Sequence, residues 1–264
     1  MCRHLGYLGP PRTLHELIYG PPHSLEHQSY APRLATCLVN ADGYGAGWYP
    51  GQGEGDGPVR FRRAQPIWTD VSFAEVARVI TTRCLVAAVR SATVGFPADE
   101  SGAQPFRAGS MLFSHNGRID DFAGVEGKLR ELAGDLAAMP DARAAVDSAL
   151  VFALVVRARR AGARLGAALA EVVTTMADLS PGRYNLLAAD GASTLAATRW
   201  GDTLYVRESA GTAVIASEPY DDEPGWREVP DRSLVTVDLA GPTVTADISP
   251  VTITQLEEAP WSAI

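Results

Sequence analysis

The sequence has few cysteines and no long uninterrupted apolar segment. Cys2, Cys37 and Cys84 are odd in number and far apart, which excludes complete pairing within the chain and any Cys-x-x-Cys zinc or redox motif. The most apolar stretch, residues 144–156, is interrupted by Asp147, and no basic segment followed by an apolar run opens the chain. We therefore expect a cytoplasmic protein with no membrane span and at least one free thiol.

Positive charge is also scarce. The 264 residues contain 23 Lys plus Arg against 31 Asp plus Glu, which gives a formal net charge of -8. Such a chain is only weakly attracted to phosphate backbones and anionic lipid surfaces, so neither nucleic acid nor membrane is an expected partner. With 46% hydrophobic residues, no internal repeat and no obvious linker, the sequence predicts one globular domain over residues 1–264.

Local patterns predict strands at both ends of the chain and helices in the middle. The expected early strands lie at residues 2–8, 35–40, 45–49, 59–64, 84–90 and 109–115, and the late ones at 184–189, 194–199, 202–207, 212–217, 233–238 and 243–248. Helices are expected from Ser72 to about Thr82, opened by a capping box with Glu75, and at 147–161 and 165–178. Residues 19–32 and the glycine-rich segment 50–58 are expected to be loops. This order favours an α+β fold in which helices pack on antiparallel sheets.

Cys2 is the first candidate for chemistry. If Met1 is removed, one residue carries both a thiol and a primary amine, whose pKa of roughly 7.7 to 8.0 leaves part of it unprotonated near neutral pH. That amine can take the thiol proton directly or through a water, which supplies nucleophile and base together. The alternative is an inert buried cysteine in a strand.

Arg90 ends the apolar run 85–89, where its planar guanidinium could receive a carboxylate through two parallel hydrogen bonds. It could equally pair with a surface acid. Thr93 could add a hydroxyl contact to the same carboxylate, or cap the turn before Gly95.

Asn116 and Gly117 offer a side-chain amide and a backbone N–H at adjacent positions. Such donors can stabilise the oxygen that becomes negative when a thiolate attacks an amide, each by about 3 kcal/mol. The same dipeptide is common in hairpin turns, and both uses can hold at once. By strand alternation His115 faces away from Asn116, so we expect it to be structural.

Asp147 opens an otherwise apolar helical run, where a carboxylate is costly unless it caps the helix or meets a cation. His23 and His27 are four residues apart, but Pro21 and Pro22 disfavour a continuous helix and no acidic pair joins them. Neither a metal nor a cofactor is expected.

The segments CRHLG at 2–6, VRSAT at 89–93 and FSHNG at 113–117 together resemble the class II glutamine amidotransferases, a branch of the N-terminal-nucleophile hydrolases. The resemblance extends to residues 42–49 and 216–219 and implies a four-layer αββα sandwich. It implies that Cys2 is the nucleophile, that Arg90 and Thr93 hold the glutamyl α-carboxylate, and that Asp147 receives the α-ammonium. Asn116 and Gly117 would form the oxyanion hole. Val94 departs from the family, which often has His there.

The amidohydrolase domain of that family would occupy the whole chain and leave no room for a synthase domain. Within the family, the same segments most resemble amidohydrolases of ergothioneine biosynthesis, which remove glutamate from γ-glutamyl-hercynylcysteine sulfoxide. Aromatic faces and carboxylates attract the trimethylammonium of a hercynyl group. The candidates for that contact are Trp48, Tyr49, Tyr220, Asp221, Asp222 and Trp226. A glutaminase subunit that feeds a separate synthase and a silent γ-glutamyl-binding module remain alternatives.

Overall fold

Two antiparallel sheets form the centre of the computed structural model, which describes residues 2–34, 39–50, 57–93, 95–209, 211–239 and 249–256. The first sheet holds, in spatial order, β11 (Trp226–Glu228), β9 (Tyr205–Ser209), β10 (Thr212–Ala216), β1 (Arg3–Thr13), β4 (Thr81–Val89), β2 (Tyr44–Trp48) and β3 (Val59–Arg63). The second holds β13 (Thr252–Gln255), β12 (Ser233–Asp238), β8 (Thr194–Arg199), β7 (Gly182–Asp190), β6 (Met111–Ile119) and β5 (Phe106–Ala108).

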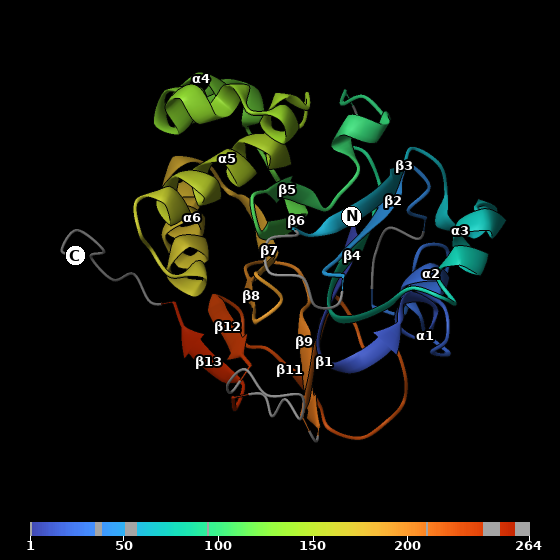
Figure 1. The fold of residues 1–264 in the computed structure, drawn as a ribbon. Helices are drawn as coiled ribbons and strands as arrows, with labels where there is room; N and C mark the ends of the chain where they lie inside the picture. The colour runs from blue at the N-terminus through green and yellow to red at the C-terminus, as the bar shows by residue number, and fades with distance from the viewer. Residues whose placement is uncertain are drawn as a thin grey trace.

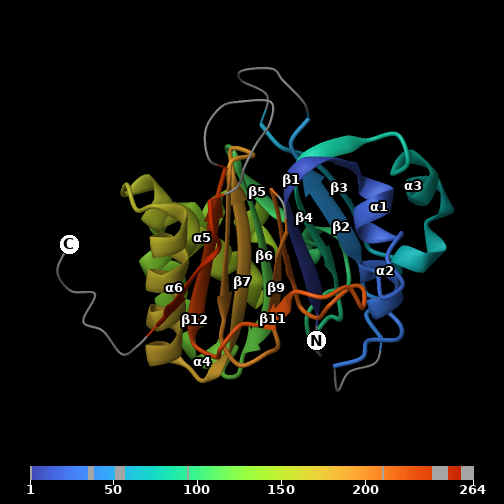
Figure 2. The ribbon, with the colours of Figure 1, turned by 90° about the horizontal axis from the view of Figure 1, so that it is seen from below.

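Helices cover the outer face of each sheet (Figures 1 and 2). The first sheet carries α1 (Leu14–Ile18), α2 (Leu25–Gln28) and α3 (Val71–Val76), and the second carries α4 (Phe122–Ala133), α5 (Asp147–Arg160) and α6 (Leu165–Leu179). Short 3-10 turns lie at η1 (Ile67–Thr69), η2 (Glu100–Gly102), η3 (Gly134–Ala138) and η4 (Pro140–Arg143). The predicted α+β fold, an αββα sandwich, is confirmed.

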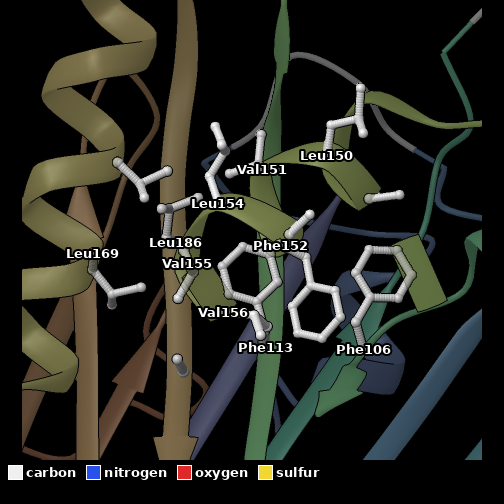
Figure 3. Close-up of a cluster of buried hydrophobic side chains, with 14 of the residues drawn as sticks. Phe106, Phe113, Leu150, Val151, Phe152, Leu154, Val155, Val156, Leu169 and Leu186 are labelled. Atoms are coloured by element: carbon white, nitrogen blue, oxygen red, sulfur yellow. The ribbon is translucent and has the colours of Figure 1, made fainter. Parts of the chain in front are cut away.

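The most deeply buried helix of the described residues is α5, which is enclosed because α4, α6 and β6 all pack against it. Figure 3 shows the ring of Phe152 between those of Phe106 and Phe113, with centroid separations of 5.5 and 5.6 Å. A helix buried on most of its sides is apolar around most of its circumference. This packing fixes the start of α5, where Asp147 lies, against β6.

Alternation along β1 determines which side chains reach the space between the sheets. Leu5 and Tyr7 pack towards α1 and α2, whereas Leu8 lies in the inter-sheet layer. Gly6 also faces that layer, since a Cβ there would lie 2.9 Å from Leu187 Cδ1. Because side chains two apart share a face, Cys2 is placed on the inter-sheet side of the strand.

Several local predictions differ from the structure. The helix expected from Ser72 to Thr82 is α3, which begins at Val71 and ends at Val76. Asp70 caps it, since its carboxylate accepts a hydrogen bond from Phe73 N at 2.9 Å. The pattern also missed α2, inside the expected loop at 19–32, and all of α4, whose run contains Gly124 and Gly127.

Some predictions fall mainly or wholly on residues outside the described ranges. They concern the strands at 35–40 and 243–248, the glycine-rich loop at 50–58 and the departure at Val94. Among the described residues, no helix combines the length and the apolar character needed to cross a bilayer.

Candidate active site

Cys2 precedes β1 and lies beside the end of β4. Pairing of Arg3 with Val89 brings the two ends together, and Cys2 Sγ lies 3.7 Å from the carbonyl oxygen of Ser91. Burial raises the pKa of the Cys2 thiol, although a backbone hydrogen bond with Ser91 and the charge of Arg90 lower it. A thiol with a raised pKa is mostly protonated near neutral pH, so nucleophilic attack requires a base.

Arg90 is buried at the end of β4, where its backbone N–H donates to Gly43 O at 2.7 Å. Its guanidinium donates to Pro97 O at 2.8 Å and packs against Gly102, at which a Cβ would lie 2.8 Å from Arg90 Cζ. No carboxylate of the described residues lies within ion-pair distance of Arg90. No direct ion pair in this part of the chain supports the alternative of a surface acid, although the pKa of the exposed Asp99 is lowered by hydrogen bonds from Ser101 and also by the charge of Arg90.

Thr93 lies in the short loop that follows Arg90. Asp42 fixes this loop by accepting a hydrogen bond from Ala92 N at 2.8 Å. Thr93 is exposed, and its carbonyl oxygen accepts a hydrogen bond from Phe96 N at 3.0 Å. Because the turn uses only the Thr93 backbone, the hydroxyl stays available for a ligand.

Asn116 and Gly117 lie within β6, opposite Asn185 and Tyr184 of β7. The hairpin-turn alternative is therefore wrong, because β6 continues unbroken to Ile119. At Gly117 a Cβ would lie 1.9 Å from Arg183 O, a distance that no side chain tolerates. Glycine is required here by the close approach of the neighbouring strand.

The Asn116 side chain reaches across the inter-sheet space to Ser217, just after β10. Asn116 Nδ2 donates to Ser217 Oγ at 3.4 Å, and the same oxygen accepts from His4 N at 3.0 Å. The side-chain oxygen of Asn116, Oδ1, is buried with no hydrogen-bond partner among the residues described. Ser217 thus connects Asn116 to the strand that follows Cys2, a link that the sequence analysis missed although it had noted residues 216–219.

His115 faces the opposite way, as strand alternation predicted. Its Nδ1 lies 3.0 Å from Ser148 Oγ and its Nε2 lies 2.9 Å from Arg183 O. Both ring nitrogens are occupied by groups on the α5 side of the sheet. The contacts support the structural role expected for His115.

Asp147 is buried at the first residue of α5, although Val146 holds the N-cap position and provides no side-chain cap. One carboxylate oxygen accepts from Ser148 N at 2.8 Å and the other from Ile119 N at 3.0 Å. These contacts fix the carboxylate between α5 and β6. Its negative charge also contributes to raising the pKa of the Cys2 thiol, after the larger effect of burial.

His4 lies on the same face of β1 as Cys2 and is fully buried. Within the described part of the chain, neither of its ring nitrogens has a hydrogen-bond partner. Burial lowers its pKa to about 3, with further contributions from the charges of His115 and Arg3. The ring is therefore neutral near pH 7 and is not an ionised partner for the thiol.

Comparison with known proteins identifies the family. Residues 21–210 match the family model described as glutamine amidotransferases class-II. The protein named gamma-glutamyl-hercynylcysteine sulfoxide hydrolase from Mycolicibacterium smegmatis is 46% identical to this chain, over 93% of this chain and 99% of the relative. The protein of the same name from Mycobacterium tuberculosis is 43% identical to this chain, over 93% of this chain and 97% of the relative.

The solved structure of a glutamine aminotransferase class-II domain protein from Silicibacter pomeroyi superposes on this chain with a TM-score of 0.65 at 19% sequence identity. The match covers 98% of this chain and 100% of that protein chain. That likeness concerns the fold alone. The family model covers more than two thirds of the sequence, and the relatives span nearly all of it. The chain belongs to the class II glutamine amidotransferases.

Proposed function

We propose that this chain hydrolyses the γ-glutamyl amide of γ-glutamyl-hercynylcysteine sulfoxide through a thioester on Cys2. Relatives that are 42 to 46% identical over 93% of the chain are named as hydrolases of this compound, which supports the choice of substrate. The residues around Cys2 support the reaction type.

The observation that carries the proposal is the placement of one buried cation and one buried anion on the strands that carry the candidate site. Arg90 follows β4 beside the start of β1, and Asp147 accepts a hydrogen bond from Ile119 N at 3.0 Å at the end of β6, the strand of Asn116 and Gly117. A γ-glutamyl group carries an α-carboxylate and an α-ammonium, which require a cation and an anion. Arg90 with Thr93 is assigned to the carboxylate, and Asp147 to the ammonium.

The reaction follows from these positions. With Met1 removed, the α-amine of Cys2 takes the thiol proton while sulfur attacks the γ-glutamyl carbonyl carbon. Asn116 and Gly117 donate hydrogen bonds to the resulting oxyanion. The C–N bond then breaks as the amine returns the proton to the leaving nitrogen. Water attacks the thioester, gives its proton to the same base, and releases glutamate with the free thiol.

The proposal also includes the cellular location, the domain content and the cofactor requirement of the enzyme. Methionine removal before a small second residue is a cytoplasmic process, which agrees with a cytoplasmic location. One amidohydrolase domain over residues 1–264, no cofactor and a small-molecule substrate complete the assignment.

The test is a substrate panel of γ-glutamyl-hercynylcysteine sulfoxide, glutamine and glutathione, with products identified by mass spectrometry. We expect the hercynyl conjugate to have the highest kcat/KM, and acid-quenched turnover to yield a glutamyl adduct on Cys2. A preference for glutamine would instead indicate a glutaminase subunit. Binding without turnover of any panel member would indicate a silent module.

A further inference from the structure

The carboxylate of Asp147 is buried without a cation beside it. Among the residues that the structure describes, no Lys, Arg or His lies within ion-pair distance of it. Oδ1 accepts from Ser148 N at 2.8 Å, and Oδ2 accepts from Ile119 N at 3.0 Å. A carboxylate oxygen has two lone pairs, so each oxygen can accept one more hydrogen bond. A bound α-ammonium needs these free positions.

The hydroxyl of Ser148 is a competitor for one of them. Its Oγ is buried, 3.3 Å from Asp147 Oδ1 and 3.0 Å from His115 Nδ1. A hydroxyl has one hydrogen to donate, so it serves either the carboxylate or the imidazole. Which acceptor it serves decides whether the second position on Asp147 Oδ1 stays open for a ligand.

The backbone of β7 decides between the two acceptors. His115 Nε2 lies 2.9 Å from Arg183 O, and a carbonyl oxygen can only accept, so Nε2 carries a hydrogen. His115 is buried, and no carboxylate of the described ranges lies within ion-pair distance of it, so its ring is uncharged. The other nitrogen, Nδ1, then has no hydrogen and accepts. The Ser148 hydroxyl therefore donates to His115 and not to Asp147.

Packing holds the imidazole in this orientation. The ring stacks on that of Tyr184, with 6.2 Å between centroids and 15° between planes. At Gly117 a Cβ would lie 2.6 Å from His115 Nε2 and 1.9 Å from Arg183 O, so there is little room at that end of the ring. The direction of the hydrogen bond from Ser148 is therefore set by the fold.

We infer that His115 is a positioning residue for the α-ammonium site, because it draws the Ser148 hydroxyl away from Asp147 and leaves that carboxylate open to the substrate. The inference rests on the proposed function, which assigns Asp147 to the α-ammonium. His115 acts through Ser148 and has no need to touch the substrate. Its contacts with Ser148 and Arg183 thus have a consequence for binding as well as for the fold.

Two replacements of His115 separate its two hydrogen bonds. In His115→Gln the side-chain amide reaches the place of Nε2 and donates to Arg183 O, but no acceptor remains at the place of Nδ1. KM for the hercynyl conjugate should rise about tenfold with little change in kcat, because the released hydroxyl turns to Asp147. In His115→Asn the shorter amide keeps an acceptor at the place of Nδ1, so KM should stay within about threefold of the wild-type value.

Removal of the hydroxyl tests the mechanism directly. When Ser148→Ala is added to His115→Gln, no hydroxyl competes for Asp147, and KM should return to within about threefold of the wild-type value. Ser233→Ala, at a buried serine of β12, is the matched control and should not restore KM when it is added to His115→Gln. A KM that stays as high in the Ser148→Ala double variant as in His115→Gln would overturn the inference, because a purely structural role predicts no rescue.

Binding of glutamate separates this inference from the proposed function. L-Glutamate differs from glutarate only by its α-ammonium, so the ratio of their affinities in calorimetry reports on Asp147. His115→Gln should lower that ratio about tenfold and Ser148→Ala should restore it, whether or not the conjugate is hydrolysed. Failure of the wild type to hydrolyse the conjugate would reject the proposed function and leave this result standing. An equal loss of affinity for both ligands in His115→Gln would overturn the inference.

Discussion

Asn116 Nδ2 lies 3.4 Å from Ser217 Oγ, and this contact crosses from one sheet to the other. Asn116 belongs to β6 of the second sheet, whereas Ser217 follows β10 of the first. The candidate oxyanion donor is therefore positioned by the sheet that carries the nucleophile. The relative placement of the two sheets is thereby coupled to the distance between Cys2 and Asn116.

Ser217→Ala should lower kcat about tenfold and change KM little, because the mutation loosens a donor that acts on the transition state. Asn116→Ala should lower kcat about a hundredfold or more. Steady-state kinetics on the hercynyl conjugate gives both values. Ser233→Ala, at another fully buried serine, serves as the control. An equal loss of kcat in the two serine variants would show that Ser217 has no specific role.

Gly117→Ala should destabilise the fold by about 3 kcal/mol, because the new methyl group would lie 1.9 Å from Arg183 O. Gly127→Ala, in the middle of α4 with open space around it, should instead stabilise by about 0.5 to 1 kcal/mol. Urea unfolding of both variants measures the difference. Similar effects at the two positions would contradict the close approach described for Gly117.

Gly102→Ala should raise KM about tenfold without mutating a residue assigned to the substrate. Its Cβ would lie 2.8 Å from Arg90 Cζ, so the guanidinium has to move while the backbone stays in place. Arg90→Lys, which replaces the planar fork by a point charge, should raise KM at least as much. A normal KM in Gly102→Ala, with the fold intact by circular dichroism, would mean that the observed position of Arg90 is not the one that binds substrate.

His4 should make the protein less stable as the pH falls. Its pKa is about 3 in the fold and about 6.5 in the unfolded chain, so between these values only the unfolded chain takes up the proton. From pH 7 to pH 5 this costs about 2 kcal/mol of unfolding free energy. His4→Gln should lose about 2 kcal/mol less over that interval, as measured by urea unfolding at both values. Parallel losses in the two proteins would contradict a neutral buried ring.

A short uncleavable N-terminal extension should abolish turnover and leave the fold unchanged, because an amide nitrogen cannot serve as the base for Cys2. Cys2→Ser should also lose most activity, whereas Cys84→Ala should retain it, since Cys84 is fully buried in the inter-sheet layer. Intact-protein mass spectrometry verifies the N-terminus in each preparation. Full activity in a preparation that verifiably retains Met1 would contradict the proposal that the α-amine of Cys2 is the base.

Strand alternation correctly predicted that the side chains of His115 and Asn116 point to opposite faces of β6. The periodicity of apolar residues predicted helices at 147–161 and 165–178, which closely match α5 and α6. These features depend on which positions along a strand or helix are buried, and the spacing of apolar residues in the sequence indicates those positions.

Features that depend on a single side chain or on tertiary packing were not predictable in this way. The cap at Asp70 displaced the start of α3 by competing with the Ser72 capping box. The helix α4 contains glycines that weaken its propensity, and it forms where it packs against α5. Ser217 acquires its contacts only when the two sheets meet, so the resemblance noted at residues 216–219 did not reveal its role.

Gln104 completes the backbone hydrogen bonding at one edge of β6. Because β5 begins only at Phe106, opposite Phe113, the backbone of His115 lies beyond the reach of that short edge strand. The Gln104 side chain takes the missing place, as its oxygen accepts from His115 N and its nitrogen donates to His115 O at 3.2 Å. An unpaired strand edge is a template on which a second molecule can add by cross-strand bonding. At His115 the glutamine leaves no such unpaired group, and it does so at a buried position, where a Cβ on Gly45 of the first sheet would lie only 2.4 Å from Gln104 O.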